Sequence, residues 1–194
     1  ILIGSQYFFM LLAIFFILSS ALSKILKRAS FYRTKGSQRD IIQVYANGGI
    51  AFLFSIIYFL NNDPVYIYLF SSCVAAAMSD TWGTEFGKLS RHKPISITSL
   101  KSIDHGISGG ITRIGTLGSL LGSSIIGFST WMMIPVPTHI IYGIILSGFL
   151  SSLFDSILGD MLQGKYKNQN GEIIEVKERD SVLIKGYPLS LIHI

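Results

Sequence analysis

Long apolar stretches alternate with short polar connections along this chain. A helix that crosses the hydrocarbon core of a bilayer needs about 20 mostly apolar residues. Five stretches reach that length, although the third carries two acids and the fifth carries two near its end. We therefore predict an all-α, polytopic membrane helix bundle with these five visible spans: residues 1–23, 41–60, 65–87, 111–133 and 139–162.

The composition supports a membrane protein. Of the 194 residues, 49% are hydrophobic and only 14% are charged, whereas soluble domains average about 25% charged residues. The first stretch has no initiator methionine, no basic leader and no clear small-residue cleavage site, so we interpret it as a span and not as a signal peptide. We also expect the chain to be truncated at both ends.

The basic residues are confined to alternate connections. All 16 lysines and arginines fall in the first connection, in the third connection with Arg113 at its margin, or in the tail after residue 163. The second and fourth connections contain none. The positive-inside bias places basic connections and tail on the cytoplasmic side, and the visible N-terminus on the opposite side. The identity of the membrane is not determined.

The chain changes character after Gln163. Residues 1–163 form the predicted bundle, and residues 164–194 form a polar cytoplasmic extension. Within that extension, Asn170-Gly171 lies between two short apolar runs, which is typical of a β-hairpin.

Four carboxylates interrupt the cytoplasmic ends of the third and fifth stretches. An acid at the centre of a membrane helix costs roughly 2.5–3.5 kcal/mol, so four unpaired acids would approach the total stability of a protein. They require a polar cavity, a basic partner or a metal ion. Mg²⁺ suits the set, because it takes carboxylates, waters and phosphate oxygens; individually paired structural acids are the alternative. The four are Asp80, Glu85, Asp155 and Asp160.

Polar residues recur near these acids at helical spacing, which places them in stripes on one face. The stripes are Arg39, Gln43 and Asn47; Asp80, Thr84 and Lys88, with Thr81 and Glu85 on the adjoining row; and Ser147, Ser151 and Asp155, with Ser152, Ser156 and Asp160 beside them. The outer halves of the stretches contain no comparable titratable groups. A coupled carrier usually places such groups near the midplane, so the pattern favours a site that faces only the cytoplasm.

The third connection contains glycines just before a predicted helix. Such a position aims backbone N–H groups and the positive end of the helix dipole at an anion. Gly106, Gly109 and Gly110 supply the glycines, while Lys101 and Arg113 could neutralise phosphate charge. A flexible loop without a ligand is the alternative. The small residues that follow, including Gly115, Gly118, Ser119, Gly122 and Ser123, are typical of close packing between membrane helices.

Four ordered motifs resemble those of a known membrane family. They are QVYANG (43–48), SDTWGTEFGKLS (79–90), ITSLKSIDHGISGGIT with GTLGSLLGS (97–123), and FDSILGDMLQ (154–163). Together they are similar to the family that contains transmembrane protein 19 and plant phytyl-phosphate kinase. The pattern is more distantly similar to dolichol and phytol kinases and to phosphatidate cytidylyltransferases.

The resemblance implies a Mg²⁺-dependent kinase that uses CTP or ATP to phosphorylate an isoprenoid monophosphate at the cytoplasmic face. Its expected partners are the lipid bilayer, the isoprenoid phosphate and the nucleotide, with no nucleic acid; the oligomeric state is not determined. A lipid cytidylyltransferase, a small-solute carrier and a non-enzymatic membrane protein are the alternatives. The implied catalytic residues are Asp80, Glu85, Lys101 and Asp155; the metal ligands are Asp80, Glu85, Asp155 and Asp160; and the substrate- or phosphate-binding residues are Gln43, Asn47, Thr81, Lys88, Ser102, Gly106, Gly109, Gly110 and Ser156.

Overall fold

The described part of the chain forms a bundle of five helices. The structure is a computed structural model, and it describes residues 2–26, 41–169, 171, 173–175 and 181–187; the side chains of residues 2–5 and 41–47 lie outside the description. The helices are α1 (Leu2–Leu26), α2 (Ile41–Asn61), α3 (Val65–Gly87), α4 (Arg113–Met133) and α5 (Thr138–Leu162). These bounds confirm the predicted helical elements within a few residues.

The start of α4 is the informative difference. The pattern predicts a helix from residue 111, but Gly110–Ile111 forms a short strand, β2, that pairs antiparallel with β1 (Ile95–Ser96). The helix begins one residue after Thr112, whose side-chain oxygen accepts a hydrogen bond from Gly115 N at 3.0 Å. A threonine cap of this kind satisfies a backbone donor that the first helical turn would otherwise leave unpaired.

The five helices are not equally apolar. Among the described residues, two pass the length and hydropathy test for a membrane span, Gln6–Leu26 and Thr138–Leu162, and α2 contributes a shorter apolar segment, Gly48–Asn61. The helices α3 and α4 fall short because α3 carries Asp80 and Glu85, while α4 is rich in glycine, serine and threonine. The sequence prediction already set the third span apart because of its two acids, and the glycine, serine and threonine content of α4 is a second departure from a uniformly apolar span.

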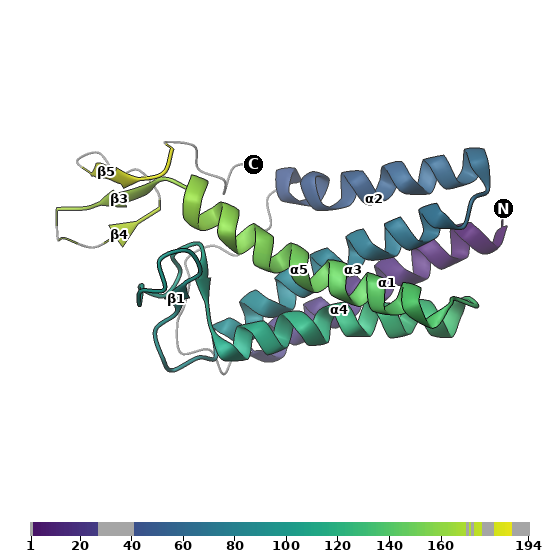
Figure 1. The fold of residues 1–194 in the computed structure, drawn as a ribbon, viewed down its shortest axis with the longest axis horizontal. Coiled ribbons are helices and arrows are strands. Elements are labelled where there is room, and N and C mark those ends of the chain that lie inside the picture. The colour runs from purple at the N-terminus through teal and green to yellow at the C-terminus, as the bar shows by residue number, and fades with distance from the viewer. Residues whose placement is uncertain (1, 27–40, 170, 172, 176–180, 188–194) are drawn as a thin grey trace.

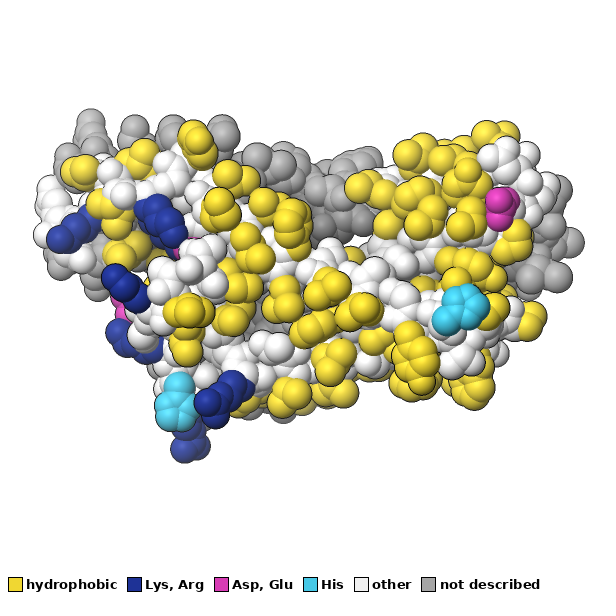
Figure 2. All heavy atoms as spheres, in the orientation of Figure 1, with side chains coloured by type: hydrophobic (Ala, Val, Ile, Leu, Met, Phe, Trp, Pro, Cys, Tyr) yellow, Lys and Arg dark blue, Asp and Glu magenta, His cyan; other side chains and the backbone are white. Residues whose placement is uncertain are grey.

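Helix α3 lies at the centre of the bundle and contacts α1, α2, α4 and α5. Its Phe70, Val74 and Met78 are buried with Leu11 of α1 and Ile126 of α4. Helix α3 is covered on several sides, and its Ser71 and Ser79 are buried, whereas many large apolar side chains of the outer helices are exposed on the surface (Figure 2). Such a surface is suited to contact with lipid.

Small residues allow α3 and α4 to approach closely. A Cβ added at Gly118 would lie 2.8 Å from the Trp82 carbonyl oxygen, and one added at Gly122 would lie 2.8 Å from the Met78 carbonyl oxygen. The predicted close-packing role of the small residues in residues 115–123 is therefore confirmed. In lipid the hydrophobic effect does not drive helices together, so close approach of their backbones supplies the van der Waals contact that holds them.

The segment between α3 and α4 and the strands lie at one end of the bundle, opposite the N-terminus of α1, whereas the α2–α3 and α4–α5 connections lie at the same end as that terminus (Figure 1). The C-terminal sheet consists of β3 (Lys165–Lys167), β4 (Ile173–Ile174) and β5 (Val182–Lys185), in the order β4-β3-β5. The antiparallel pairing of Lys167 with Ile173 confirms the predicted hairpin. Lysine and arginine side chains gather at the same end in the face shown in Figure 2. The all-α class is thus confirmed, with short strands added at that end.

Candidate functional site

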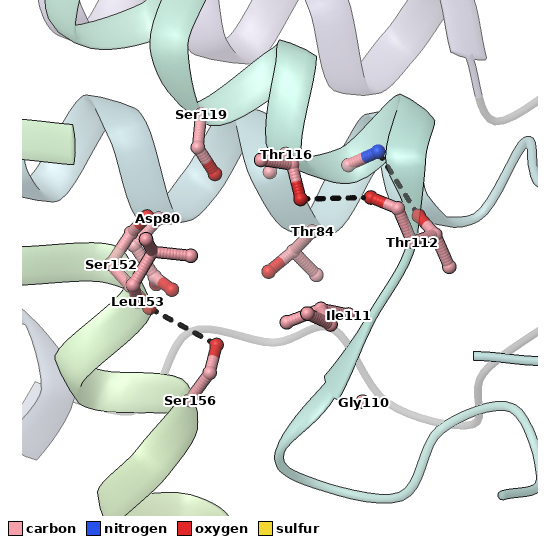
Figure 3. A pocket seen from close by; sticks show the side chains of 12 residues that line it. Asp80, Thr84, Gly110, Ile111, Thr112, Thr116, Ser119, Ser152, Leu153 and Ser156 are labelled. Carbon is pink, nitrogen blue, oxygen red and sulfur yellow. Dashed lines mark hydrogen bonds between the residues drawn. The ribbon is translucent and has the colours of Figure 1, made fainter. Parts of the chain in front are cut away.

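A polar pocket lies between α3, α4 and α5, beside β2. Its volume is about 80 Å³. We call it the polar pocket and define it by its lining residues: Asp80, Gly83, Thr84, Gly110, Ile111, Thr112, Gly115, Thr116, Ser119, Ser152, Leu153 and Ser156. Figure 3 shows side chains from the three helices directed at a common space. Polar side chains from three helices therefore line one space, and Asp80 is the one predicted acid among them.

The lining is rich in hydrogen-bond acceptors. Thr116 donates its hydroxyl hydrogen to the Thr112 carbonyl at 3.0 Å, and Ser156 donates to the Ser152 carbonyl at 3.0 Å (Figure 3). Ser152 donates to the Phe149 carbonyl at 3.1 Å. Because these hydrogens are used within their own helices, the hydroxyl groups present mainly oxygen lone pairs to the pocket. Asp80 is the carboxylate of the lining, and no lysine or arginine is among the lining residues.

The pocket is small for a complete nucleotide. Pockets that enclose drug-sized ligands usually measure about 300–1,000 Å³, whereas this one measures about 80 Å³. A water molecule takes a share of about 30 Å³ in the liquid. The described residues therefore enclose room for a head group, a hydrated cation or a few waters, and not for a base and ribose.

Asp160 was predicted to be a metal ligand, but its carboxylate is occupied by protein groups. Its side chain is 1% exposed, and its Oδ1 accepts from Lys165 Nζ at 2.5 Å and from Lys185 Nζ at 3.0 Å. Its Oδ2 accepts from the hydroxyls of Ser96 and Thr98. Two lysines and two hydroxyls occupy both oxygens, so Asp160 belongs to an internal ion pair that joins α5 to the C-terminal sheet and to the segment that contains Ser96 and Thr98.

The other two predicted metal ligands also lie apart from Asp80. Glu85 forms a salt bridge with Lys88 one turn along α3, at 3.0 Å, and neither residue lines the polar pocket. Asp155 is exposed on α5 and is likewise absent from the lining. Within the described residues no group of three or more histidine, cysteine, aspartate or glutamate side chains could hold a metal ion. The structure does not form the four-carboxylate centre that the sequence predicted.

The glycine-containing loop is divided between two roles. We refer to residues 88–112 as the α3–α4 loop. Lys101, Ser102 and Gly106 are exposed, and none of the three lines the pocket. Gly109 is buried with a φ of +80°, and Gly110 lines the pocket. Of the residues predicted to bind phosphate from this loop, only Gly110 lies at the polar pocket.

The remaining predicted substrate-binding residues are distributed differently. Ser156 lines the pocket. Thr81 donates its hydroxyl to the Ala77 carbonyl at 2.8 Å and does not line it. The side chains of Gln43 and Asn47 lie outside the described residues.

Several hydroxyl residues that line the pocket were not among the predicted site residues, although Thr84 and Ser152 had been placed in the polar stripes. Thr112, Thr116, Ser119 and Ser152 belong to this group, together with Thr84. Their signal was the repeat of hydroxyls three or four residues apart, which places them on one helix face. The same spacing also occurs in structural helix packing, so it identifies a polar face without identifying a site.

A second polar cluster, also missed, joins the α3–α4 loop to the C-terminal sheet. Glu175 accepts from Ser108 N at 2.6 Å, from Ser108 Oγ at 3.0 Å and from Gln163 Nε2 at 2.8 Å. Burial raises the pKa of the Glu175 carboxyl above its ordinary value, against the lowering effect of the two Ser108 hydrogen bonds. Nothing in the local sequence EIIEVK distinguished this glutamate from its neighbour.

Comparisons with known proteins agree with the membrane assignment. The chain is 33% identical to the uncharacterized membrane protein MJ0933 of Methanocaldococcus jannaschii, over 84% of this chain and 67% of that protein. It is 28% identical to Protein PGR of Arabidopsis thaliana, over 79% of this chain and 63% of that protein. The chain thus spans about two thirds of the length of these relatives.

No solved structure matches the chain. The profile of the integral membrane protein family DUF92 matches residues 1–190. This match and the similarity to MJ0933 confirm the membrane family expected from the motifs, while the names of the two relatives state neither a kinase nor a cytidylyltransferase activity. The chain belongs to the DUF92 family of integral membrane proteins.

Proposed function

We propose that this chain forms the head-group site of a membrane-embedded kinase that phosphorylates an isoprenoid monophosphate, with CTP or ATP as the phosphoryl donor. The observation that carries the proposal is the polar pocket, where Asp80 and five helix hydroxyls meet inside a largely apolar bundle. Three of the four sequence motifs that resemble the phytyl-phosphate kinase family contribute lining residues to the pocket; they are residues 79–90, 97–123 and 154–163.

The chemistry of the lining favours a phosphate that arrives with a cation. A bare phosphate would face the Asp80 carboxylate and the acceptor oxygens of Thr116 and Ser156, which repel it. A bound cation reverses that repulsion. Mg²⁺ commonly uses only one or two protein carboxylates, with waters and substrate phosphates as its other ligands. Asp80 alone meets this reduced requirement, and the pocket has room for waters.

Asp80 is therefore the residue that would hold Mg²⁺, with the neighbouring hydroxyls as polar support. When bound, the ion would neutralise the charge of the facing phosphate groups. In the proposed reaction an oxygen of the isoprenoid monophosphate attacks the terminal phosphorus of the nucleotide. The bond to the leaving nucleoside diphosphate breaks, and an isoprenoid diphosphate forms. Positioning and charge neutralisation supply most of the catalysis in such transfers.

The volume of the polar pocket determines which parts of the substrates could lie inside it. The acceptor phosphate fits the polar pocket, and the isoprenoid chain would lie among the apolar side chains that the helices expose toward lipid. The nucleoside is too large for the enclosed space, so it would lie outside the pocket, at the end where basic side chains gather (Figure 2). Steering of a nucleotide by basic side chains is an expected effect of such a charge distribution.

The test is a product assay. Purified protein in lipid nanodiscs is incubated with CTP or ATP, Mg²⁺, and phytyl or geranylgeranyl phosphate, and the lipids are analysed by mass spectrometry. The proposal predicts an isoprenoid diphosphate together with CDP or ADP. A CDP-lipid with released pyrophosphate would identify a cytidylyltransferase instead. No product across the panel, from protein with an intact unfolding transition, would contradict an enzyme of either class.

A further inference from the structure

The C-terminal sheet is attached to the α3–α4 loop through Ser108. The Ser108 backbone N–H donates to one carboxylate oxygen of Glu175 at 2.6 Å, and its hydroxyl contacts the other oxygen at 3.0 Å and Gln163 Oε1 at 2.7 Å. Gln163 Nε2 completes the ring by donating to Glu175 at 2.8 Å. Hydrogen bonds to a charged group are shorter and stronger than neutral ones, so this contact fixes the backbone of the loop as well as its side chain.

The opposite arm of the same loop is attached to the end of α5. Asp160 accepts from the hydroxyls of Ser96 and Thr98, while Lys165 of β3 and Lys185 of β5 hold its other oxygen. The two arms are joined to each other, because Ile97 N donates to the Gly109 carbonyl at 2.9 Å. The loop is thus held at both arms by groups on α5 and in the C-terminal sheet.

The attached segment leads directly into the wall of the polar pocket. Gly110 and Ile111 follow Ser108 by two and three residues, and with Thr112 they are the lining residues that do not belong to a helix. The helical walls are fixed by packing of α3 against α4 and α5. The loop wall has a different support, since the hydrogen bonds of Ser108 and the pairing of β2 with β1 hold it in place.

We infer that Glu175 is a positioning residue: through Ser108 it latches the C-terminal sheet to the α3–α4 loop and so holds the Gly110–Ile111 wall of the polar pocket in place. Glu175 does not line the pocket and is not expected to touch a substrate. The inference concerns the shape of the pocket and the access to it. Only its prediction for turnover rests on the proposed function.

The latch is tested by the reactivity of one pocket cysteine, without any substrate. Cys73 is the sole cysteine in the sequence, so a Cys73→Ser background carries no other thiol. The probe is introduced by Thr116→Cys: position 116 lines the pocket, and cysteine is close to threonine in size. Maleimide labelling is followed well below the melting temperature. Glu175→Ala removes the hydrogen bonds between the carboxylate and Ser108, so the loop wall should open more often. We expect the labelling rate to rise about tenfold, because a hydrogen bond to a charged group commonly contributes enough free energy to change an opening equilibrium by that factor.

Two further variants separate positioning from general damage. Glu175→Gln should recover part of the slow labelling, because its amide oxygen can still accept from Ser108 N. The matched control is Asp104→Asn, which removes an exposed ion pair with Lys93 in the same loop and should leave the labelling rate unchanged. Equal labelling in wild type and Glu175→Ala, or an equal increase in Asp104→Asn, would overturn the inference.

A measurement on the unsubstituted protein tests the inference even if a variant does not fold. Hydrogen exchange should be slow at the Ser108 amide, which donates to Glu175, and faster in the exposed turn at residues 104–106. Equal exchange at the two places would also overturn the latch. Because neither readout involves nucleotide or lipid phosphate, failure of the latch and failure of the proposed kinase are distinguishable. If turnover is found, Glu175→Ala should raise KM for the isoprenoid phosphate more than it lowers kcat.

Discussion

Gly109 packs directly against Asp160. A Cβ at position 109 would lie 2.8 Å from the Asp160 Cα, and the φ of Gly109 is +80°, in the region that side chains rarely adopt. The contact brings the α3–α4 loop onto the end of α5 at the residue that binds Lys165 and Lys185. The contact between this glycine and this buried acid therefore helps to fix where the loop lies relative to the polar pocket.

Gly109→Ala should destabilise the protein strongly. A left-handed backbone conformation at a non-glycine residue costs about 1–3 kcal/mol, and overpacking adds about 1–3 kcal/mol. Thermal unfolding in detergent measures the sum. Gly171→Ala is the matched control, since Gly171 has a φ of +82° but its nearest neighbour, Lys167 Cε, would be 3.8 Å from an added Cβ. Equal losses in the two variants would show that the contact with Asp160 contributes nothing.

Asp160→Asn should cost about 3–5 kcal/mol, the range for removing one partner of a buried ion pair. The substitution keeps the shape of the side chain but leaves Lys165, 7% exposed, without its carboxylate. Chemical or thermal unfolding provides the measurement. In Asp104→Asn the lost pair with Lys93 is exposed, at 58% and 63%, so the expected change is below about 1 kcal/mol. A similar small change in Asp160→Asn would contradict the structural role assigned to this acid.

Asp80→Asn should reduce the proposed phosphoryl transfer by about 100-fold or more, the usual effect of removing a key electrostatic group from a site. Asp155→Asn should leave the rate within about twofold, because Asp155 is exposed outside the lining of the polar pocket. Initial rates at saturating nucleotide distinguish the two. Comparable losses in both variants would restore the shared site that the sequence alone predicted, and would show that the polar pocket is incomplete.

The contribution of Glu175 to stability should fall as the pH rises. Burial raises the pKa of Glu175 above its ordinary value of 4.5, so the folded protein retains this proton to a higher pH than the unfolded chain. The folded state is therefore favoured most below the ordinary value, and this advantage is lost as the pH rises through the raised native pKa. Subtracting the melting curve of Glu175→Gln from that of the wild type isolates the effect. A difference that is independent of pH would show that Glu175 titrates normally.

The orientation follows from the basic connections and is open to a direct test. In a Cys73→Ser background, Lys167→Cys reports the C-terminal sheet and His139→Cys reports the start of α5; both positions are exposed. The positive-inside bias predicts that an impermeant thiol reagent labels His139→Cys from outside intact cells, and Lys167→Cys only in inverted vesicles. The reverse pattern would place the polar pocket at the outer end of the bundle.

The sequence by itself determined the helices, their approximate bounds, the basic end and the close packing of α3 on α4. These features depend on apolar length, on charge distribution and on small residues at helical spacing, all of which are local properties. The sequence also located the acids that interrupt the bundle, and it identified Asp80 among the polar residues of α3.

Only the tertiary structure decided which acids share a space. Asp80 and Asp160 both end apolar stretches and look equivalent in sequence, yet Asp80 lines the polar pocket and Asp160 is held by two lysines that follow it in the chain. The difference arises because the rotation of each helix about its axis and the path of the α3–α4 loop depend on contacts between distant segments. A helical repeat shows which residues share a face, but packing against other helices decides what that face meets.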